Sequence, residues 1–425
     1  MTNVPDSFCL LPWIHAHVGA QGQRKLCCID VSRERDPRLA LSPVQTLEEY
    51  WNSDDVKLVR RQMLDGVLPD RCINCSTDGN RALSYKDDML ARWPNEIEKA
   101  IASTAPDGST DLKPITFDYR SSTCNLRCRT CGPHSSTSAE IEARRSERLQ
   151  QVGEESGKWD AAYLGRRAAA MANARDDLME AARERRIRHL YWAGGEPLMD
   201  ETHWEVMGEL ARTGEAANVD VAYNTNLTVF SYRGQKVEDI WPHFKSVHVQ
   251  ASIDGVGEAG EYIRTGFKTE IFARHLQSLQ ELALKYRQIG VMLDLTLTSV
   301  GLLHLGDLLT FALDRDVAVT AKLMVPRKIN RYMAVEFLPD GVRQNWCAKW
   351  KAWIARNDPT KLFATVDATL DVAMSRDTLQ EGRENDQQAA FQAEVIAAFE
   401  EARRDSGTFR RLLSVDPRLD DLLPG

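Results

Sequence analysis

The stretch Cys124-Asn-Leu-Arg-Cys128-Arg-Thr-Cys131 places three of the chain's nine cysteines within eight residues, directly after a predicted strand at 115–119. A cubane iron–sulfur cluster takes one thiolate per iron, so three thiolates from one loop leave one iron open to a substrate or a cofactor. Zinc is the alternative. A structural zinc site is closed by four ligands, and His134 is the one further candidate at short range.

Strands and helices are predicted to alternate around this loop. Such alternation favours βαβ units and a parallel sheet or barrel, so we predict an α/β fold over residues 114–330. An insertion at 138–186, rich in Ala, Arg and Glu, is predicted to form exposed helices. The segments with the length and composition of strands are 115–119, 188–193, 219–225, 246–253, 291–298 and 317–325.

Three further polar motifs end predicted strands. They are Tyr191-Trp-Ala-Gly-Gly-Glu-Pro197, Tyr223-Asn-Thr-Asn226 and Ser252-Ile-Asp-Gly255. Each one alone also fits an ordinary loop. Together with the cysteine loop they stand at the C-terminal ends of four consecutive predicted strands, which is where barrel enzymes gather their sites.

In these motifs and their order, residues 115 to about 325 resemble the radical S-adenosylmethionine (SAM) superfamily. The resemblance implies a partial (β/α)6 barrel and a [4Fe–4S] cluster held by Cys124, Cys128 and Cys131. It also implies that the open iron chelates the amino and carboxylate groups of SAM. The implied activity is reductive cleavage of SAM to a 5′-deoxyadenosyl radical that abstracts hydrogen from a substrate, with an electron donor such as flavodoxin or ferredoxin.

The resemblance also assigns residues to the SAM molecule. Gly194, Gly195 and Glu196 would hold its ammonium group, because glycines permit close backbone approach and a carboxylate accepts charge-assisted hydrogen bonds. Arg264 would meet the SAM carboxylate with its forked donors, and a surface helix arginine is the alternative interpretation. Thr130 departs from the family, which commonly has an aromatic residue there. The full implied set is Gly194, Gly195, Glu196, Pro197, Asn224, Asn226, Ser252, Asp254 and Arg264.

A second group of cysteines lies near the start of the chain. Twelve residues separate Cys9 from Gly22 and four more precede Cys27, a spacing that predicts a hairpin with the glycine in its turn. With the pair Cys72-Ile-Asn-Cys75 this makes four thiols, enough to close a cubane cluster. A zinc site with four cysteine ligands uses the same residues, and spacing alone does not separate the two.

This arrangement resembles the auxiliary-cluster domain of radical SAM enzymes, called twitch or SPASM-like. That domain normally follows the barrel, whereas here a small α+β domain at residues 1–95 is expected to precede it. Four thiols favour full ligation, and therefore an auxiliary [4Fe–4S] cluster that transfers electrons. Cys28 is a spare that could replace Cys27 or pack as a small apolar side chain. The expected ligands are Cys9, Cys27, Cys72 and Cys75.

Strand alternation predicts a polar face inside the barrel. If Ser252 meets SAM, His248 and Gln250 point to the same side, because side chains alternate along a strand. A barrel interior packed for stability would carry branched apolar residues instead. The alternative is that Asp118 with Arg120, and Asp294 with Lys322, form structural ion pairs. The side chains expected to line a polar substrate are Asp118, Arg120, His248, Gln250, Asp294 and Lys322.

The amino-acid composition limits the kinds of partner that the protein is expected to bind. With 54 Lys and Arg against 62 Asp and Glu, the net charge of −8 lacks the basic surplus of a dedicated nucleic-acid-binding protein. Residues 1–7 show no secretory signal, and Asp294, His304 and Asp307 interrupt the apolar stretch 289–313. We expect a cytoplasmic protein that does not associate with membranes and does not bind nucleic acid.

The C-terminal region, 338–425, is predicted to be helical. Trp346, Trp350 and Trp353 recur at helical spacing and predict a buried helix face. Cys347 lies on the same helix and is expected to pack in the core, not to react.

The sequence leaves the substrate open. Enzymes of the resembling families modify ribosomal peptides or proteins, or dehydrogenate, epimerise or couple small molecules. No leader-peptide-binding domain precedes Cys9, which favours a small molecule or a protein recognised through 138–186. The competing class is a non-catalytic iron–sulfur or zinc protein that serves as an electron carrier or a scaffold.

Overall fold

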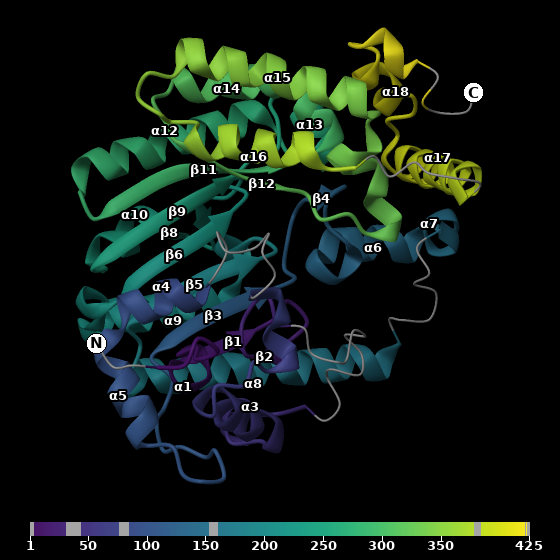
Figure 1. The fold of residues 1–425 in the computed structure, drawn as a ribbon. Coiled ribbons are helices and arrows are strands. Elements are labelled where there is room, and N and C mark those ends of the chain that lie inside the picture. The colour runs from purple at the N-terminus through teal and green to yellow at the C-terminus, as the bar shows by residue number, and fades with distance from the viewer. Residues whose placement is uncertain are drawn as a thin grey trace. The chain divides into compact units, whose positions relative to one another are not determined.

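The computed structural model describes residues 4–30, 44–75, 85–152, 160–377, 384–420 and 422 (Figure 1). Residues 153–159 of the predicted insertion lie outside the described residues. The chain forms two compact units. The first comprises Met1–Ser122, Lys158–Ala222 and Asp239–Val247, and the second comprises Thr123–Gly157, Tyr223–Glu238 and His248–Gly425.

The first unit contains strands in the order β5-β3-β1-β2. Their bounds are β1 (His15–Val18), β2 (Arg24–Lys25), β3 (Thr116–Ser121) and β5 (His189–Gly194). β1 runs parallel to β3, with His17 opposite Asp118, and β3 runs parallel to β5, with Asp118 opposite Tyr191. The sequence predicts the β1–β2 hairpin but not the pairing of β1 with β3.

A glycine turn joins β1 to β2, as predicted, but Cys9 and Cys27 lie outside these strands, which were expected to carry them. Gly22 has a φ of +87°, a left-handed conformation that glycine adopts without strain. Its N–H donates to the carbonyl oxygen of Gly19 at 2.8 Å. A Cβ on Gly22 would lie 2.6 Å from the Cβ of Ala170, so space as well as backbone conformation requires glycine here.

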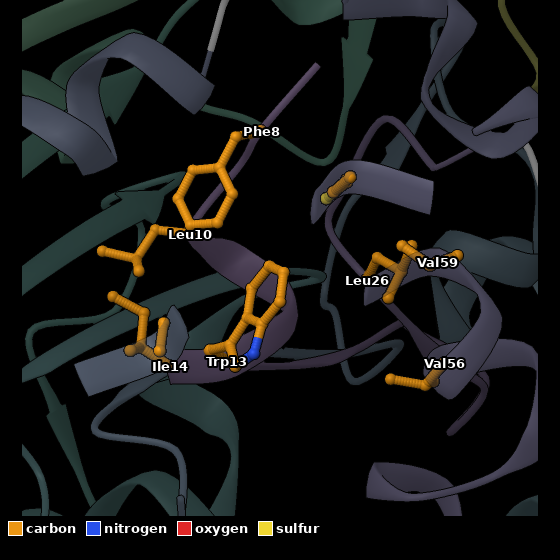
Figure 2. Packing of buried hydrophobic residues seen from close by; sticks show 9 residues of the cluster. Phe8, Leu10, Trp13, Ile14, Leu26, Val56 and Val59 are labelled. Carbon is orange, nitrogen blue, oxygen red and sulfur yellow. The ribbon is translucent and has the colours of Figure 1, made fainter. Parts of the chain in front are cut away.

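The first unit also contains helices and a hydrophobic cluster. Their bounds are α1 (Leu11–Ile14), α2 (Leu47–Trp51), α3 (Asp54–Leu64), α4 (Tyr85–Arg92), α5 (Pro94–Ala102), α8 (Ala161–Arg183) and α9 (Glu201–Thr213). α8 packs against α9 and β3 (Figure 1). Cys9 and Cys72 pack against the cluster, so both cysteine-bearing segments rest on one core. Figure 2 shows its members, Phe8, Leu10, Trp13, Ile14, Leu26, Val56, Val59, Met63 and Ala100.

The second unit contains strands in the order β12-β11-β9-β6, and β6 and β9 have residues in both units. Their bounds are β6 (Asp220–Thr225), β9 (Ser246–Ser252), β11 (Ile289–Leu297) and β12 (Val319–Leu323). Two short antiparallel pairs are β4 (Arg127–Cys128) with β10 (Arg264–Thr265), and β7 (Ser231–Tyr232) with β8 (Gln235–Lys236). β3, β5, β6, β9, β11 and β12 are the six predicted strands, which confirms an α/β fold with a large, mostly parallel sheet. The partial barrel stays a prediction from the motifs.

Helices account for most of the rest of the second unit, and α10 (Val237–Ile240) has residues in both units. Their bounds are α6 (Thr137–Arg145), α7 (Glu147–Val152), α11 (Gly257–Ile263), α12 (Thr269–Lys285), α13 (Ser299–Leu303), α14 (Leu305–Leu313), α15 (Asp340–Asn357), α16 (Ala364–Ser375), α17 (Glu384–Arg403) and α18 (Thr408–Leu413). On α15, Trp350 is buried and donates its indole N–H to the Leu302 carbonyl oxygen at 2.7 Å. Cys347 is fully buried on the same helix, as a packing role requires. Among the described residues, no helix combines the length and the apolar composition of a membrane span.

Candidate metal and cofactor sites

The three-cysteine loop of the second unit is fixed by a short strand pair. Cys128 lies in β4, directly opposite Arg264 in β10. The Arg129 N–H donates to the Ile263 carbonyl oxygen at 2.8 Å, which extends the attachment beyond the pair. The loop is therefore held at its centre by main-chain hydrogen bonds.

The start of α6 holds the other end of the loop. The Ser138 hydroxyl donates to the Cys124 carbonyl oxygen at 2.7 Å, and the Cys124 N–H donates to the Thr137 hydroxyl at 3.2 Å. The Ser136 hydroxyl donates to the Leu126 carbonyl oxygen at 2.6 Å. These bonds use side-chain hydroxyls to satisfy backbone groups of an irregular loop, so the loop keeps a defined shape without regular structure.

Arg264 brings a buried positive charge to two of the three thiols. It is 9% exposed and lies in β10, so it is not the surface helix residue of the alternative interpretation. Its Nε donates to Asp254 Oδ2 at 2.8 Å, while Oδ1 of Asp254 accepts the Thr296 N–H at 3.1 Å. Burial alone would lower the pKa of Arg264, but Asp254 and Cys128 outweigh that effect and keep the guanidinium charged.

Two thiols of the loop, Cys128 and Cys131, change each other's pKa. A hydrogen bond from Cys128 lowers the pKa of Cys131 to about 7, and the charge of Arg264 acts in the same direction. The same hydrogen bond, together with burial, raises the pKa of Cys128. The Cys124 sulfur accepts the Leu126 N–H at 3.4 Å. The hydrogen bond and the charge of Arg264 thus favour the thiolate form of Cys131, and thiolate is the form that ligates a metal.

The Tyr223-Asn-Thr-Asn226 motif contributes to two separate contacts within the second unit. The Asn226 amide nitrogen donates to Asn125 Oδ1 at 3.0 Å and lies 3.9 Å from the Cys124 sulfur. The Asn224 amide nitrogen donates to Asp294 Oδ2 at 2.8 Å. Asn226 is therefore placed beside the cysteine loop, whereas Asn224 belongs with the predicted polar residues.

The Gly-Gly-Glu-Pro motif belongs to the first unit. Gly194 has a φ of +102°, and a Cβ there would lie 2.4 Å from the Ser121 carbonyl oxygen. The Gly195 N–H donates to that same oxygen at 2.7 Å. Glu196 is fully buried, and its carboxylate accepts the Leu198 N–H at 3.0 Å, just after Pro197. The motif thus combines a backbone conformation at Gly194 that only glycine adopts without strain with the buried carboxylate of Glu196.

The first unit gathers the five N-terminal cysteines. Burial raises the pKa of Cys9 to about 12, and the charges of Cys72 and Cys75 act in the same direction. Cys27 is influenced in the same way by Cys28 and Cys9, and Cys75 by Cys28. Cys28 therefore acts on the pKa values of Cys27 and Cys75.

An ion pair that the sequence analysis does not predict joins the two cysteine-bearing segments. Arg71, next to Cys72, donates from Nε to Oδ1 of the buried Asp30 at 3.0 Å. The other carboxylate oxygen of Asp30 accepts the Leu26 N–H at 2.9 Å, beside Cys27. A charged bidentate contact of this kind fixes both geometry and distance, so it holds the hairpin against the Cys-x-x-Cys segment.

The six predicted substrate residues divide between the units and include both ion pairs. Lys322 Nζ lies 2.6 Å from Asp294 Oδ2 in the second unit, where His248 is exposed and Gln250 is half-buried. In the first unit, Arg120 Nη2 lies 3.0 Å from Asp118 Oδ2. Both ion pairs of the alternative interpretation are therefore present. Substrate binding by these residues stays a prediction.

No family model and no curated protein matches the chain. Solved structures that it resembles include native anSMEcpe with bound AdoMet, at 16% identity and a TM-score of 0.35, covering 59% of this chain and 61% of that one. Streptococcus suis SuiB bound to S-adenosylmethionine is another, at 10% identity and a TM-score of 0.36, covering 73% of this chain and 67% of that one. The chain spans about three fifths of the length of anSMEcpe.

Arg129 is a residue that sequence reasoning missed. It directly follows Cys128, is buried against the Tyr262 ring at 3.6 Å, and donates to Asp405 at 2.8 Å. Its position between two cysteines of the loop is the one signal that marks it in the sequence.

Proposed function

We propose that this chain is a radical SAM enzyme that abstracts hydrogen from a polar substrate. The single observation that carries the proposal is the hydrogen-bonded loop of Cys124, Cys128 and Cys131, in which the buried charge of Arg264 acts on Cys128 and Cys131. Three thiolates suit an iron–sulfur cluster with one open iron better than a closed zinc site.

Cys124, Cys128 and Cys131 would hold the catalytic [4Fe–4S] cluster. When bound, such a cluster supplies the electron for reductive cleavage of SAM to methionine and a 5′-deoxyadenosyl radical. The chain's own part is electrostatic: Arg264 stabilises the negative charge of the thiolates, and Asp254 keeps the guanidinium oriented.

SAM binding by the remaining motif residues is part of the proposal. Glu196 would accept hydrogen bonds from the SAM ammonium, next to the glycine backbone at Gly194 and Gly195, and Pro197 ends that motif. Asn226, beside the cysteine loop, and Ser252, at the end of β9, would contribute polar contacts. The remaining proposed contacts come from Asn224, Asp254 and Arg264.

A second [4Fe–4S] cluster in the first unit would take up the electron that the oxidised substrate radical gives off, while a donor such as flavodoxin or ferredoxin would reduce the catalytic cluster. Four of the five thiols gathered there suffice to ligate all four irons of a cubane cluster. Our proposed ligands are Cys9, Cys27, Cys72 and Cys75, and Cys28 is close enough to the group to replace Cys27.

Matched cysteine variants test this proposal. After anaerobic reconstitution we expect about eight irons per chain and formation of 5′-deoxyadenosine from SAM under reduction. Cys124→Ala should abolish SAM cleavage, Cys72→Ala should lower the iron content and retain cleavage, and Cys347→Ala is the control for a cysteine packed in the core. About four irons together with bound zinc would contradict the auxiliary cluster, and full iron loading without cleavage would contradict the enzyme.

A further inference from the structure

Two histidines and an aspartate of the first unit lie together on adjacent strands. His15 and His17 occupy alternate positions of β1, so they share one face of the sheet. In β3, Asp118 lies directly opposite His17. One ligand atom from each of the three side chains lies within 4.8 Å of the others. Neither the cysteines nor the SAM motifs include any of these atoms.

Hydrogen bonds fix the protonation of the His15 ring. The Thr116 hydroxyl donates its single proton to the Ile14 carbonyl oxygen at 3.1 Å. Its oxygen is therefore an acceptor toward His15 Nδ1, 2.9 Å away. With the proton on Nδ1, the lone pair of His15 is on Nε2. Metal-binding histidines are typically oriented by a partner of this kind on the other ring nitrogen.

His17 and Asp118 share a hydrogen bond, which a bound metal ion would replace. His17 Nδ1 lies 2.9 Å from Asp118 Oδ2, and both side chains are buried. Arg120 donates to Asp118 from Nε at 3.0 Å and from Nη2 at 3.0 Å, which holds the carboxylate in place. Because Arg120 also offsets part of the carboxylate charge, the two imidazoles must provide most of the affinity for a cation.

We propose that His15, His17 and Asp118 form a binding site for a divalent first-row transition metal ion. Two imidazoles and one carboxylate are a donor set that suits Fe(II), Mn(II), Co(II) or Zn(II), and a rigid parallel strand pair presents them on one face. Thiolate clusters take a different ligand type, so the site can be filled independently of them.

Metal titration of the full chain tests the proposal. Mn(II) is the main probe because it prefers nitrogen and oxygen donors over thiolates. Anaerobically reconstituted protein is dialysed against Mn(II), and in parallel against Co(II), and bound metal is counted by mass spectrometry, without SAM. We expect one Mn(II) per chain, and loss of the six-line electron paramagnetic resonance signal of free Mn(II) on binding.

Variants identify the ligands. His15→Ala and His17→Ala should each weaken Mn(II) binding at least tenfold, and Asp118→Asn by about 10–100-fold. His243→Ala, an exposed histidine of the same unit, should leave binding unchanged. Circular dichroism of each variant checks that the chain is folded. If wild-type protein bound neither metal, or if the His15→Ala/His17→Ala variant bound both as tightly as wild type, the site would not exist. Because SAM is absent, these results are independent of radical SAM activity.

Discussion

Single side chains decide both the stability and the charge of the candidate site. Arg264 lies 100 or more positions in the sequence from the cysteines that it approaches in the fold, and the sequence does not reveal its pairing with Asp254. The motifs identify both residues as candidates, but they do not predict the contact between them.

Removing the charge of Arg264 should leave Asp254 as a buried, unpaired carboxylate. We expect Arg264→Met to lower the free energy of unfolding by about 3–5 kcal/mol, the typical cost of breaking a buried ion pair from one side. Urea unfolding measures the change. Arg212→Met, at a side chain 70% exposed on α9, is the control and should stay within about 0.5 kcal/mol. A change at Arg264 no larger than the control would contradict the pairing.

A buried histidine makes stability depend on pH. Burial lowers the pKa of His203 from 6.5 to about 3, so the fold favours its neutral form. Below pH 6.5 the unfolded chain binds more protons than the folded chain, and stability falls as the pH drops toward about 3. This residue contributes a slope of up to about 1.4 kcal/mol per pH unit.

Urea unfolding at pH 7, 6 and 5 measures that slope. His203→Gln should flatten the dependence, and His243→Gln, at an exposed position, should not. An unchanged slope in His203→Gln would show that other groups cause the acid sensitivity.

Elements with a local sequence signature could be predicted, and those that depend on distant partners could not. All six predicted strands are present, because each is an apolar segment bounded by its own turn signals. The pairing of β1 with β3 joins residues 101 positions apart, as between His17 and Asp118, and nothing local encodes it. The same holds for the Asp30–Arg71 contact, which spans 41 positions. The cysteines of both groups were found because their spacing is itself the signal.

The β1–β2 hairpin should require its turn glycine. Gly22→Ala places a Cβ in a left-handed backbone position and against Ala170, so we expect a loss of about 1–3 kcal/mol in unfolding free energy. Gly165→Ala in α8 meets no atom within 4 Å and should stabilise the protein by about 0.5–1 kcal/mol. Thermal unfolding of both variants checks the pair, and equal effects would contradict the account of the turn.

The Asp30–Arg71 contact should control loading of the auxiliary cluster. Arg71→Met removes the link between the hairpin and the Cys72 segment, so we expect the iron content to fall from about eight toward about four per chain. Arg61→Met, at an exposed position on α3, should retain full iron. Iron counting after reconstitution decides the matter, and full iron in Arg71→Met would show that the ion pair does not position the ligands.

At the scale of the whole molecule, each proposed set of metal ligands lies within one compact unit. The N-terminal cysteines belong to the first unit, whereas Cys124, Cys128 and Cys131 belong to the second. We therefore expect the two clusters to load independently. The triple variant Cys124→Ala/Cys128→Ala/Cys131→Ala should keep about four irons, and complete loss of iron would contradict independent loading.

The most direct test of radical SAM activity is the product that wild-type protein forms from SAM. Anaerobically reconstituted chain, reduced in the presence of SAM, should release methionine and 5′-deoxyadenosine, and Cys124→Ala should release none. Wild-type protein that carries its full iron and still forms no 5′-deoxyadenosine would contradict the proposed function.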